Sequence, residues 1–352
     1  MQKAALAFLE RLVATPSPSG YEQPAQKLMR ERMAEFADQV RTDVHGNVVA
    51  ALNAEAPLRV MLAGHVDEIG LMVKHVTDEG FLYVAQIGGI DPVVAVAQRV
   101  IVHGPDGPVP GVVGRKAIHL TDKEERGKPM KLHELWIDIG ASDKDDALEA
   151  VRVGDPVTFD ADPVHLRNGL LAARAFDDRM GAFAVAETLR KLRRKTLDVA
   201  VYGVSTVQEE IGLRGARTSA FGIDPHAGIA IEVGHATDTP GVEKKRVGDF
   251  PCGKGPIVAR GANINPVLHR LICDAAEAAD IDIQHEGVPG GTGTDANAIQ
   301  ITRAGVAAAL VAVPCRYMHS PCEIVSLADL DQASTLLARL LADLPAEVDF
   351  TP

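Results

Sequence analysis

The stretch at residues 197–212 constrains the fold of this chain more than any other. It begins as an apolar, β-branched run of strand length and ends in two adjacent acids, Glu209 and Glu210. In α/β sheets, ligands bind outside the carboxyl ends of the strands. Neighbouring residues at the end of a strand point in different directions, so one acid can bind a cation while the other transfers protons. For an isolated acidic pair, a solvated turn is the alternative.

Another apolar run, at residues 59–64, leads directly into His65 and Asp67. Because strand side chains alternate, positions 65 and 67 are expected to face the same way. An aspartate in that place can orient a histidine that binds a metal through its other nitrogen. A hydrogen-bonded turn without a metal is equally compatible with this motif alone.

Three more junctions carry residues of the same kind. Asp177 and Asp178 precede a helix rich in Ala, Val and Leu. Acids at a helix start are commonly caps, but Asp177 could also bridge two cations there, with Asp178 as a supporting residue. Glu232 and His235 end a short apolar strand, and both are candidate ligands. His319 lies just past the last apolar strand.

Composition excludes several classes of protein. The net charge of −12, without a lysine- or arginine-rich run, argues against a nucleic-acid partner. No apolar stretch reaches membrane-spanning length, and residues 1–13 are amphipathic, unlike a signal peptide. The four cysteines form no CxxC pair, which argues against a zinc finger or a thioredoxin motif. We therefore expect a cytoplasmic protein with reduced thiols.

A change in the pattern of apolar segments along the chain predicts two structural units. Residues 71–164 hold short Val- and Ile-rich segments separated by turn signals, with a short helix near 143–151. We expect an all-β module there, inserted into an α/β domain made of residues 1–70 and 165–352. The glycine-rich loop at 287–296 lacks the Gly-Lys-Ser/Thr ending of a phosphate loop and is expected to shape a pocket wall. Helices are expected at residues 2–14, 22–38, 266–279 and 326–344, and histidines without shared spacing are taken as structural: His75, His103, His119, His133 and His165.

Five short motifs occur in order along the chain. They are Gly-His-Val-Asp-Glu-Ile-Gly at 64–70, Ala-Phe-Asp-Asp-Arg at 175–179, Gln-Glu-Glu-Ile-Gly at 208–212, Gly-Thr-Asp-Ala at 293–296 and Tyr-Met-His-Ser-Pro at 317–321. In this order they resemble one family of peptidases, the tetrahedral (TET-type) metallo-aminopeptidases, which include glutamyl and deblocking aminopeptidases. The resemblance runs from the first expected helix to the last.

The resemblance implies two divalent metal ions per subunit, with Zn²⁺ expected and Co²⁺ or Mn²⁺ as alternatives. His65 and Glu232 would bind one ion, and Glu210 and His319 the other. Asp177 would bridge both ions. Many relatives carry Asp at the position of Glu232, which leaves open how tightly the first metal is held.

The resemblance also implies the reaction. Asp67 would orient His65, and Glu209 would act as the general base for a water shared by the two metals, so that the enzyme removes N-terminal residues from short peptides. The catalytic domain would be an α/β/α sandwich with a mixed central sheet. The inserted module would serve in dimerisation, and the dimers would build a hollow homododecamer.

Two other functions are compatible with the same residues. An N-acyl-amino-acid amidohydrolase of the same dinuclear class differs in acting on substrates without a free α-amino group. A non-catalytic shell-forming protein is the third possibility, although a scaffold has no need of this set of acids and histidines. Some relatives have been called endoglucanases, but no carboxylate pair of glycosidase type is evident in the sequence.

Overall fold

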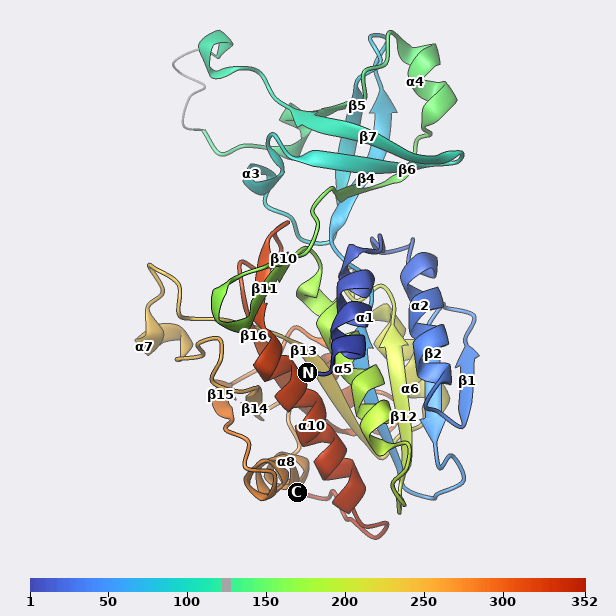
Figure 1. The fold of residues 1–352 in the computed structure, drawn as a ribbon, viewed down its shortest axis with the longest axis vertical. Helices are drawn as coiled ribbons and strands as arrows, with labels where there is room; N and C mark the ends of the chain where they lie inside the picture. The colour runs from blue at the N-terminus through green and yellow to red at the C-terminus, as the bar shows by residue number, and fades with distance from the viewer. Residues whose placement is uncertain (122–127) are drawn as a thin grey trace.

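The computed structural model describes residues 1–121 and 128–352, and within these ranges eleven strands form one mixed sheet (Figure 1). Its centre consists of four parallel neighbours: β12 (Ala200–Thr206), β3 (Arg59–His65), β13 (Ala227–His235) and β16 (Ala307–Arg316). The carboxyl ends of these strands therefore meet at one edge of the sheet. In the register of β12 with β3, Thr206 lies opposite His65.

The flanking strands are shorter and mostly antiparallel. On one side β2 (Val48–Leu52) pairs with β12, and β1 (Gln39–Thr42) pairs with β2. On the other side follow β17 (Glu323–Ser326), β11 (Leu170–Ala173) and β10 (Val164–His165). A branch leaves β16 through β14 (Ile257–Gly261), which pairs in parallel with β15 (Gln284–Val288).

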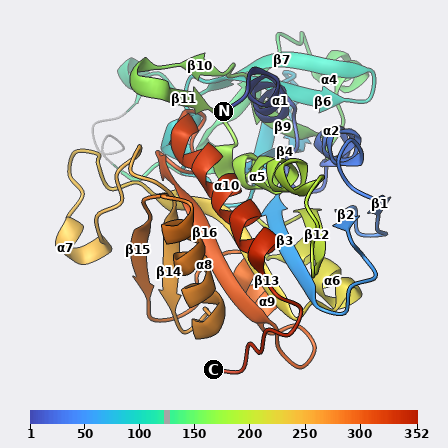
Figure 2. The ribbon, with the colours of Figure 1, turned by 60° about the horizontal axis from the view of Figure 1, so that its bottom comes forward.

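Helices cover both faces of the sheet (Figure 2). The larger core lies beneath α1 (Lys3–Ala14), α2 (Gln23–Ala34), α5 (Phe176–Leu192), α8 (Pro266–Ala278) and α10 (Leu327–Asp343). A smaller core lies beneath α6 (Arg214–Ile223) and α9 (Asp295–Gln300). Strand β3 serves both cores, because Val60 and Leu62 face one and Met61 and Ala63 face the other. The predicted α/β/α sandwich with a mixed sheet is confirmed.

The caps of the helices follow from the sequence. Asn265 accepts hydrogen bonds from the backbone of Val267 and Leu268, and Pro266 occupies the first turn, so α8 begins where the sequence predicts. Ser326 caps α10 by accepting from the backbone N–H of Asp329. The second predicted helix is shorter than expected, since α2 ends at Ala34. Helix α6 and the strands β14, β15 and β17 were not predicted from the sequence.

Between residues 70 and 159, the described part of the chain forms six strands that close into a barrel with its own apolar core (Figure 1). Their order is β4 (Gly70–Val76), β5 (Leu82–Ile87), β8 (Trp136–Asp138), β7 (Gly107–Gly114), β6 (Arg99–Gly104) and β9 (Pro156–Phe159). Two short helices accompany the barrel, α3 (Pro92–Ala95) and α4 (Lys144–Ala150), and α4 lies where a helix was expected. Elsewhere in the described chain lies the short α7 (Lys244–Val247). None of the described helices combines the length and apolar character needed to cross a bilayer.

The first prediction concerns the contact between β3 and α5. A methyl group on Gly64 would overlap the backbone of Gly181 and Ala182. Gly64→Ala should therefore lower the stability of the fold by about 1–3 kcal/mol or more, as overpacking does. The measurement is the midpoint of urea unfolding. Gly222→Ala in α6 is the matched control, because its methyl group would meet no atom within 4 Å and should be neutral or mildly stabilising. Equal midpoints for the two variants would contradict this role of Gly64.

Candidate metal centre

A pocket of about 390 Å³ opens at the edge where the parallel strands end. Six of the seven residues predicted for the site line this pocket, although they come from five separate segments of the chain. They are His65, Asp177, Glu209, Glu210, Glu232 and His319. The predicted pocket wall is also present, since Thr292, Gly293 and Thr294 of the glycine-rich loop line the pocket.

Asp177 lies between the two histidines. Its Oδ1 is 3.3 Å from Nε2 of His65, and its Oδ2 is 3.2 Å from Nε2 of His319. Each carboxylate oxygen thus faces a different imidazole. One oxygen of this buried carboxylate therefore lies with the side chains around His65, and the other lies with the side chains around His319.

The three glutamates complete the two groups. Glu232 and Glu209 each bring an Oε2 atom to 3.7 Å from Nε2 of His65. Glu210 brings Oε1 to 3.7 Å from Nε2 of His319. Oε1 of Glu210 and Oε1 of Glu232 are buried and make no hydrogen bond with any described residue. Buried polar atoms are normally paired, so these two oxygens lack the partner that a cation would provide.

The pKa values of these groups reflect buried, crowded charge. Burial and, to a lesser degree, neighbouring carboxylates together raise the pKa of Glu209 to about 8 and that of Glu210 to about 8. Burial and then the charge of Asp178 raise the pKa of Glu232 well above its ordinary value. Burial opposes protonation of His65, but Glu232 and Glu209 raise its pKa well above the ordinary value. A divalent cation would relieve this repulsion.

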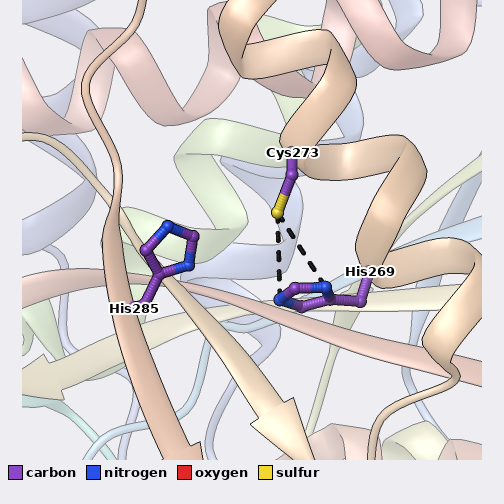
Figure 3. Close-up of side chains that lie close together, drawn as sticks. All are labelled: His269, Cys273 and His285. Carbon is purple, nitrogen blue, oxygen red and sulfur yellow. Dashed lines mark hydrogen bonds between the residues drawn. The ribbon is translucent and has the colours of Figure 1, made fainter.

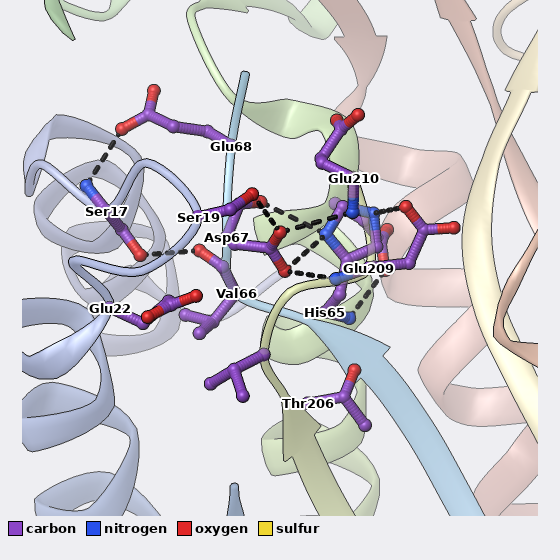
Figure 4. Close-up of polar contacts among 12 residues, drawn as sticks. Ser17, Ser19, Glu22, His65, Val66, Asp67, Glu68, Thr206, Glu209 and Glu210 are labelled. Carbon is purple, nitrogen blue, oxygen red and sulfur yellow. Dashed lines mark hydrogen bonds and ion pairs between the residues drawn. The ribbon is translucent and has the colours of Figure 1, made fainter. Parts of the chain in front are cut away.

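Asp67 holds the turn that carries the two acids (Figure 4). Its Oδ1 accepts a hydrogen bond from the backbone N–H of Glu209 at 3.0 Å, and its Oδ2 accepts from that of Glu210 at 3.2 Å. The Ser19 hydroxyl also donates to Oδ2, at 2.7 Å. Nδ1 of His65 lies 3.0 Å from the main-chain oxygen of Asp67 and 3.5 Å from its carboxylate. Asp67 therefore ties the end of β3 to the end of β12.

Two further buried acids, one of them not singled out from the sequence, support the centre in the same way. Asp178 lies near His65 and Glu232, but its oxygens accept from the backbone N–H groups of His65 and Gly181, both at 3.1 Å. Glu323 accepts from the backbone N–H groups of Asp177 and His319, both at 2.9 Å. Glu323 was missed because an acid four residues after His319 carries no signal of its own.

The barrel also reaches the centre. Nδ1 of His319 lies 2.7 Å from the carbonyl oxygen of Gly89, which follows β5. His319 therefore donates from Nδ1, which leaves Nε2 facing Asp177. His235 lines the pocket wall, but no ion pair or hydrogen bond joins it to the carboxylates around His65 and His319 among the described residues. The compact groups that could hold a metal at this edge are His65 with Asp177 and Glu210, and His65 with Asp178 and Glu232.

A buried ion cluster forms around Glu68, the residue that follows Asp67. The Glu68 carboxylate contacts the guanidinium groups of Arg174 and Arg179, and it accepts from the backbone N–H of Ser17 at 2.9 Å. Burial would raise the pKa of Glu68, but the two arginines hold it below the ordinary value. Arg179 also donates to the carbonyls of Leu12 and Val13, so the cluster fixes the end of α1.

Comparison with known proteins first identifies the class. The chain is 38% identical over 348 residues to the lysyl aminopeptidase of Pyrococcus furiosus, covering 98% of this chain and 99% of that protein. The structure of a TET aminopeptidase from a marine-sediment Thaumarchaeota archaeon superposes with a TM-score of 0.93 at 33% identity, covering 97% of both chains. The TET1 peptidase of Pyrococcus horikoshii, which can assemble into a tetrahedron or a large octahedral shell, gives 0.86 at 32% identity, covering 97% of this chain and all of that one. The chain is thus related to peptidases along its whole length.

The family follows from a direct match. The model of the M42 glutamyl aminopeptidase family covers residues 46–336. This chain belongs to that family, as its motifs predicted.

The second prediction concerns Glu68. Glu68→Gln would leave two buried guanidinium groups without their counter-charge, and the loss should be about 3–5 kcal/mol of unfolding free energy. Asp78→Asn is the control, because it breaks the exposed pair with Lys144 and should cost at most about 1 kcal/mol. Thermal unfolding of both variants provides the measurement. A shift for Glu68→Gln no larger than that of the control would show that the cluster contributes little.

Proposed function

We propose that this protein is a dinuclear metallo-aminopeptidase that removes N-terminal residues from short peptides. The observation that carries the proposal is Asp177, whose two carboxylate oxygens face His65 and His319 separately. Family membership supports aminopeptidase activity, and the geometry of the chain's own side chains supports the two-cation centre.

The donor set fits two divalent cations. His65 and Glu232 would bind one and Glu210 and His319 the other, with Asp177 shared. The unpartnered oxygens of Glu210 and Glu232 support this assignment. Imidazoles and carboxylates suit Zn²⁺, and they also accept Co²⁺ or Mn²⁺. When bound, such ions lower the pKa of a water molecule and polarise a carbonyl group.

Glu209 is the acid left over for proton transfer. Its carboxylate lies 3.7 Å from Nε2 of His65, and its backbone N–H donates to the carboxylate of Asp67. Glu209 would take the proton of the attacking water and pass it to the leaving amine. Asp67 would act through others, by fixing the turn that carries Glu209 and by contacting Nδ1 of His65.

The same proposal covers assembly and location. The barrel would mediate dimerisation, and the dimers would form a homododecamer, as the tetrahedral assembly of the Pyrococcus horikoshii relative suggests. A hollow particle would admit short, unfolded peptides. All four cysteines are free, which agrees with a reducing, cytoplasmic compartment.

The third prediction separates the two adjacent acids. Glu209→Gln keeps size and hydrogen bonding but removes the proton acceptor, so turnover of aminoacyl-para-nitroanilides should fall about 10²- to 10⁴-fold while both metals stay bound. Glu210→Gln replaces an anionic ligand with a neutral amide, so one metal should bind more weakly and added metal should restore part of the activity.

Elemental analysis beside turnover at rising metal concentration tests both variants. N-acetylated substrates serve as the control for an amidohydrolase and should not be cleaved by the wild type. Loss of metal from Glu209→Gln but not from Glu210→Gln would reverse the two roles. Unchanged turnover in both variants would refute the mechanism.

The fourth prediction concerns assembly through the barrel. Val93 and Leu120 are exposed apolar side chains of this unit, 60% and 71% accessible. Val93→Asp/Leu120→Asp should shift the sedimentation coefficient from that of a large oligomer toward smaller species, because an interface disfavours unpaired buried charge. Val44→Asp, in the turn between β1 and β2, should keep the wild-type size. A wild-type monomer at every concentration tested would contradict the proposal, as would identical sedimentation of all three proteins.

A further inference from the structure

Figure 3 shows a second cluster of metal-type side chains, formed by His269, Cys273 and His285. None of these three residues lines the pocket of the candidate metal centre. His269 and Cys273 come from α8, and His285 comes from β15. Sγ of Cys273 is 3.9 Å from Nδ1 and 3.8 Å from Nε2 of His269. One ligand atom from each of the three residues lies within 4.8 Å of the others.

The local structure explains why the three meet. Residues four apart on a helix share a face, so His269 and Cys273 present their side chains together. Strand β15 pairs with β14, placing His285 opposite Val258, and α8 packs against β14. His285 is exposed, while His269 and Cys273 are half-buried, so the cluster is open to solvent on one side.

Two imidazoles and a thiolate form a donor set that suits Zn²⁺. Tetrahedral zinc with the usual bond lengths separates neighbouring ligand atoms by roughly 3.3–3.6 Å. Sγ of Cys273 is nearly equidistant from the two ring nitrogens of His269, at 3.9 and 3.8 Å, so this ring has to rotate until one nitrogen points at the metal. The ligand atom of His285, which lies within 4.8 Å of the other two, also has to move closer. Three protein ligands would leave the fourth position to water.

Some charged groups around the cluster favour the binding of a cation, and others oppose it. Burial, Arg260 and His285 lower the pKa of His269, so its imidazole is neutral at pH 7 and can donate a lone pair. Burial raises the pKa of the Cys273 thiol, so a metal has to displace a proton there. The Arg260 guanidinium opposes a cation, whereas Asp274 lies near enough to Cys273 to favour one.

We propose that His269, Cys273 and His285 bind one further divalent cation, Zn²⁺, separate from the two cations of the candidate metal centre. The bound ion would join α8 to β15. Because strand side chains alternate, the next residue, Glu286, points to the opposite side, where it lines the pocket of the candidate metal centre. The third ion would thus fix the strand that supplies one wall of that pocket.

Cobalt bound to a cysteine thiolate absorbs in the near ultraviolet, so this absorption reports binding at the cluster and not at the proposed catalytic centre. Cys273 would be the thiolate ligand here, whereas no cysteine is among the proposed ligands of the other centre. The chelated full-length protein, titrated with Co²⁺, should develop the near-ultraviolet absorption of a cobalt–thiolate bond. This band should be complete by about three equivalents per chain, because the two sites of the candidate metal centre compete for the added cobalt. Added Zn²⁺ should abolish that band by displacing the cobalt.

Three variants make the test specific. Cys273→Ser should lose the band and bind about one metal fewer per chain by elemental analysis, and the exposed His285→Gln should weaken cobalt binding at least tenfold. Cys252→Ser, a half-buried cysteine outside the cluster, should keep the band, as should Glu210→Gln. Absence of the band in the wild type, or its survival in Cys273→Ser, would overturn the proposal. A band that Zn²⁺ in excess cannot displace would overturn the choice of zinc.

Discussion

Crowded negative charge at the carboxyl edge of the sheet dominates the physics of this protein. Nε2 of His65 lies 3.3–3.7 Å from carboxylate oxygens of Asp177, Glu209 and Glu232. A fourth acid, Glu210, follows Glu209 directly in the chain. Placing ionised carboxylates together away from water is costly unless protons or cations compensate them. Burial, and then the neighbouring carboxylates, raise the pKa values of Glu209 and Glu210 to about 8, so without a cation these groups take up protons.

The fold handles its buried acids in two ways. Asp67, Asp178 and Glu323 have each carboxylate oxygen paired with a backbone N–H group, so they hold the ends of the strands and need no cation. Glu210 and Glu232 instead each keep one buried oxygen without a partner. This difference separates acids that position the chain from acids that are free to bind a ligand, and residue type alone does not reveal it.

The residues at the ends of the parallel strands could be predicted from the sequence, whereas contacts between segments far apart in the chain could not. Apolar runs that end in acids or histidines identified His65, Glu210 and Glu232, because parallel strands bring their carboxyl ends to one edge. The contact of His319 with Gly89 joins positions 230 residues apart, and no periodicity encodes it. Helix α6 is amphipathic, but it was missed because it has only ten residues and because Gly215, Ser219 and Gly222 are poor helix formers. Packing on β3 and β12 stabilises it.

The site also depends on units outside the sheet. The carbonyl oxygen of Gly89 in the barrel segment fixes the ring of His319, and Ser19, beyond the end of α1, donates to Asp67. The Glu68 cluster contacts Ser17 and holds the end of α1, and this fixes the segment from which Ser19 reaches Asp67. A change in the packing of the barrel or of α1 would therefore alter the orientation of His319 or Asp67 without substituting either residue. The barrel and the sheet have separate apolar cores and come from different parts of the sequence. The geometry at the edge of the sheet nevertheless depends on the barrel segment through the contact of Gly89 with His319.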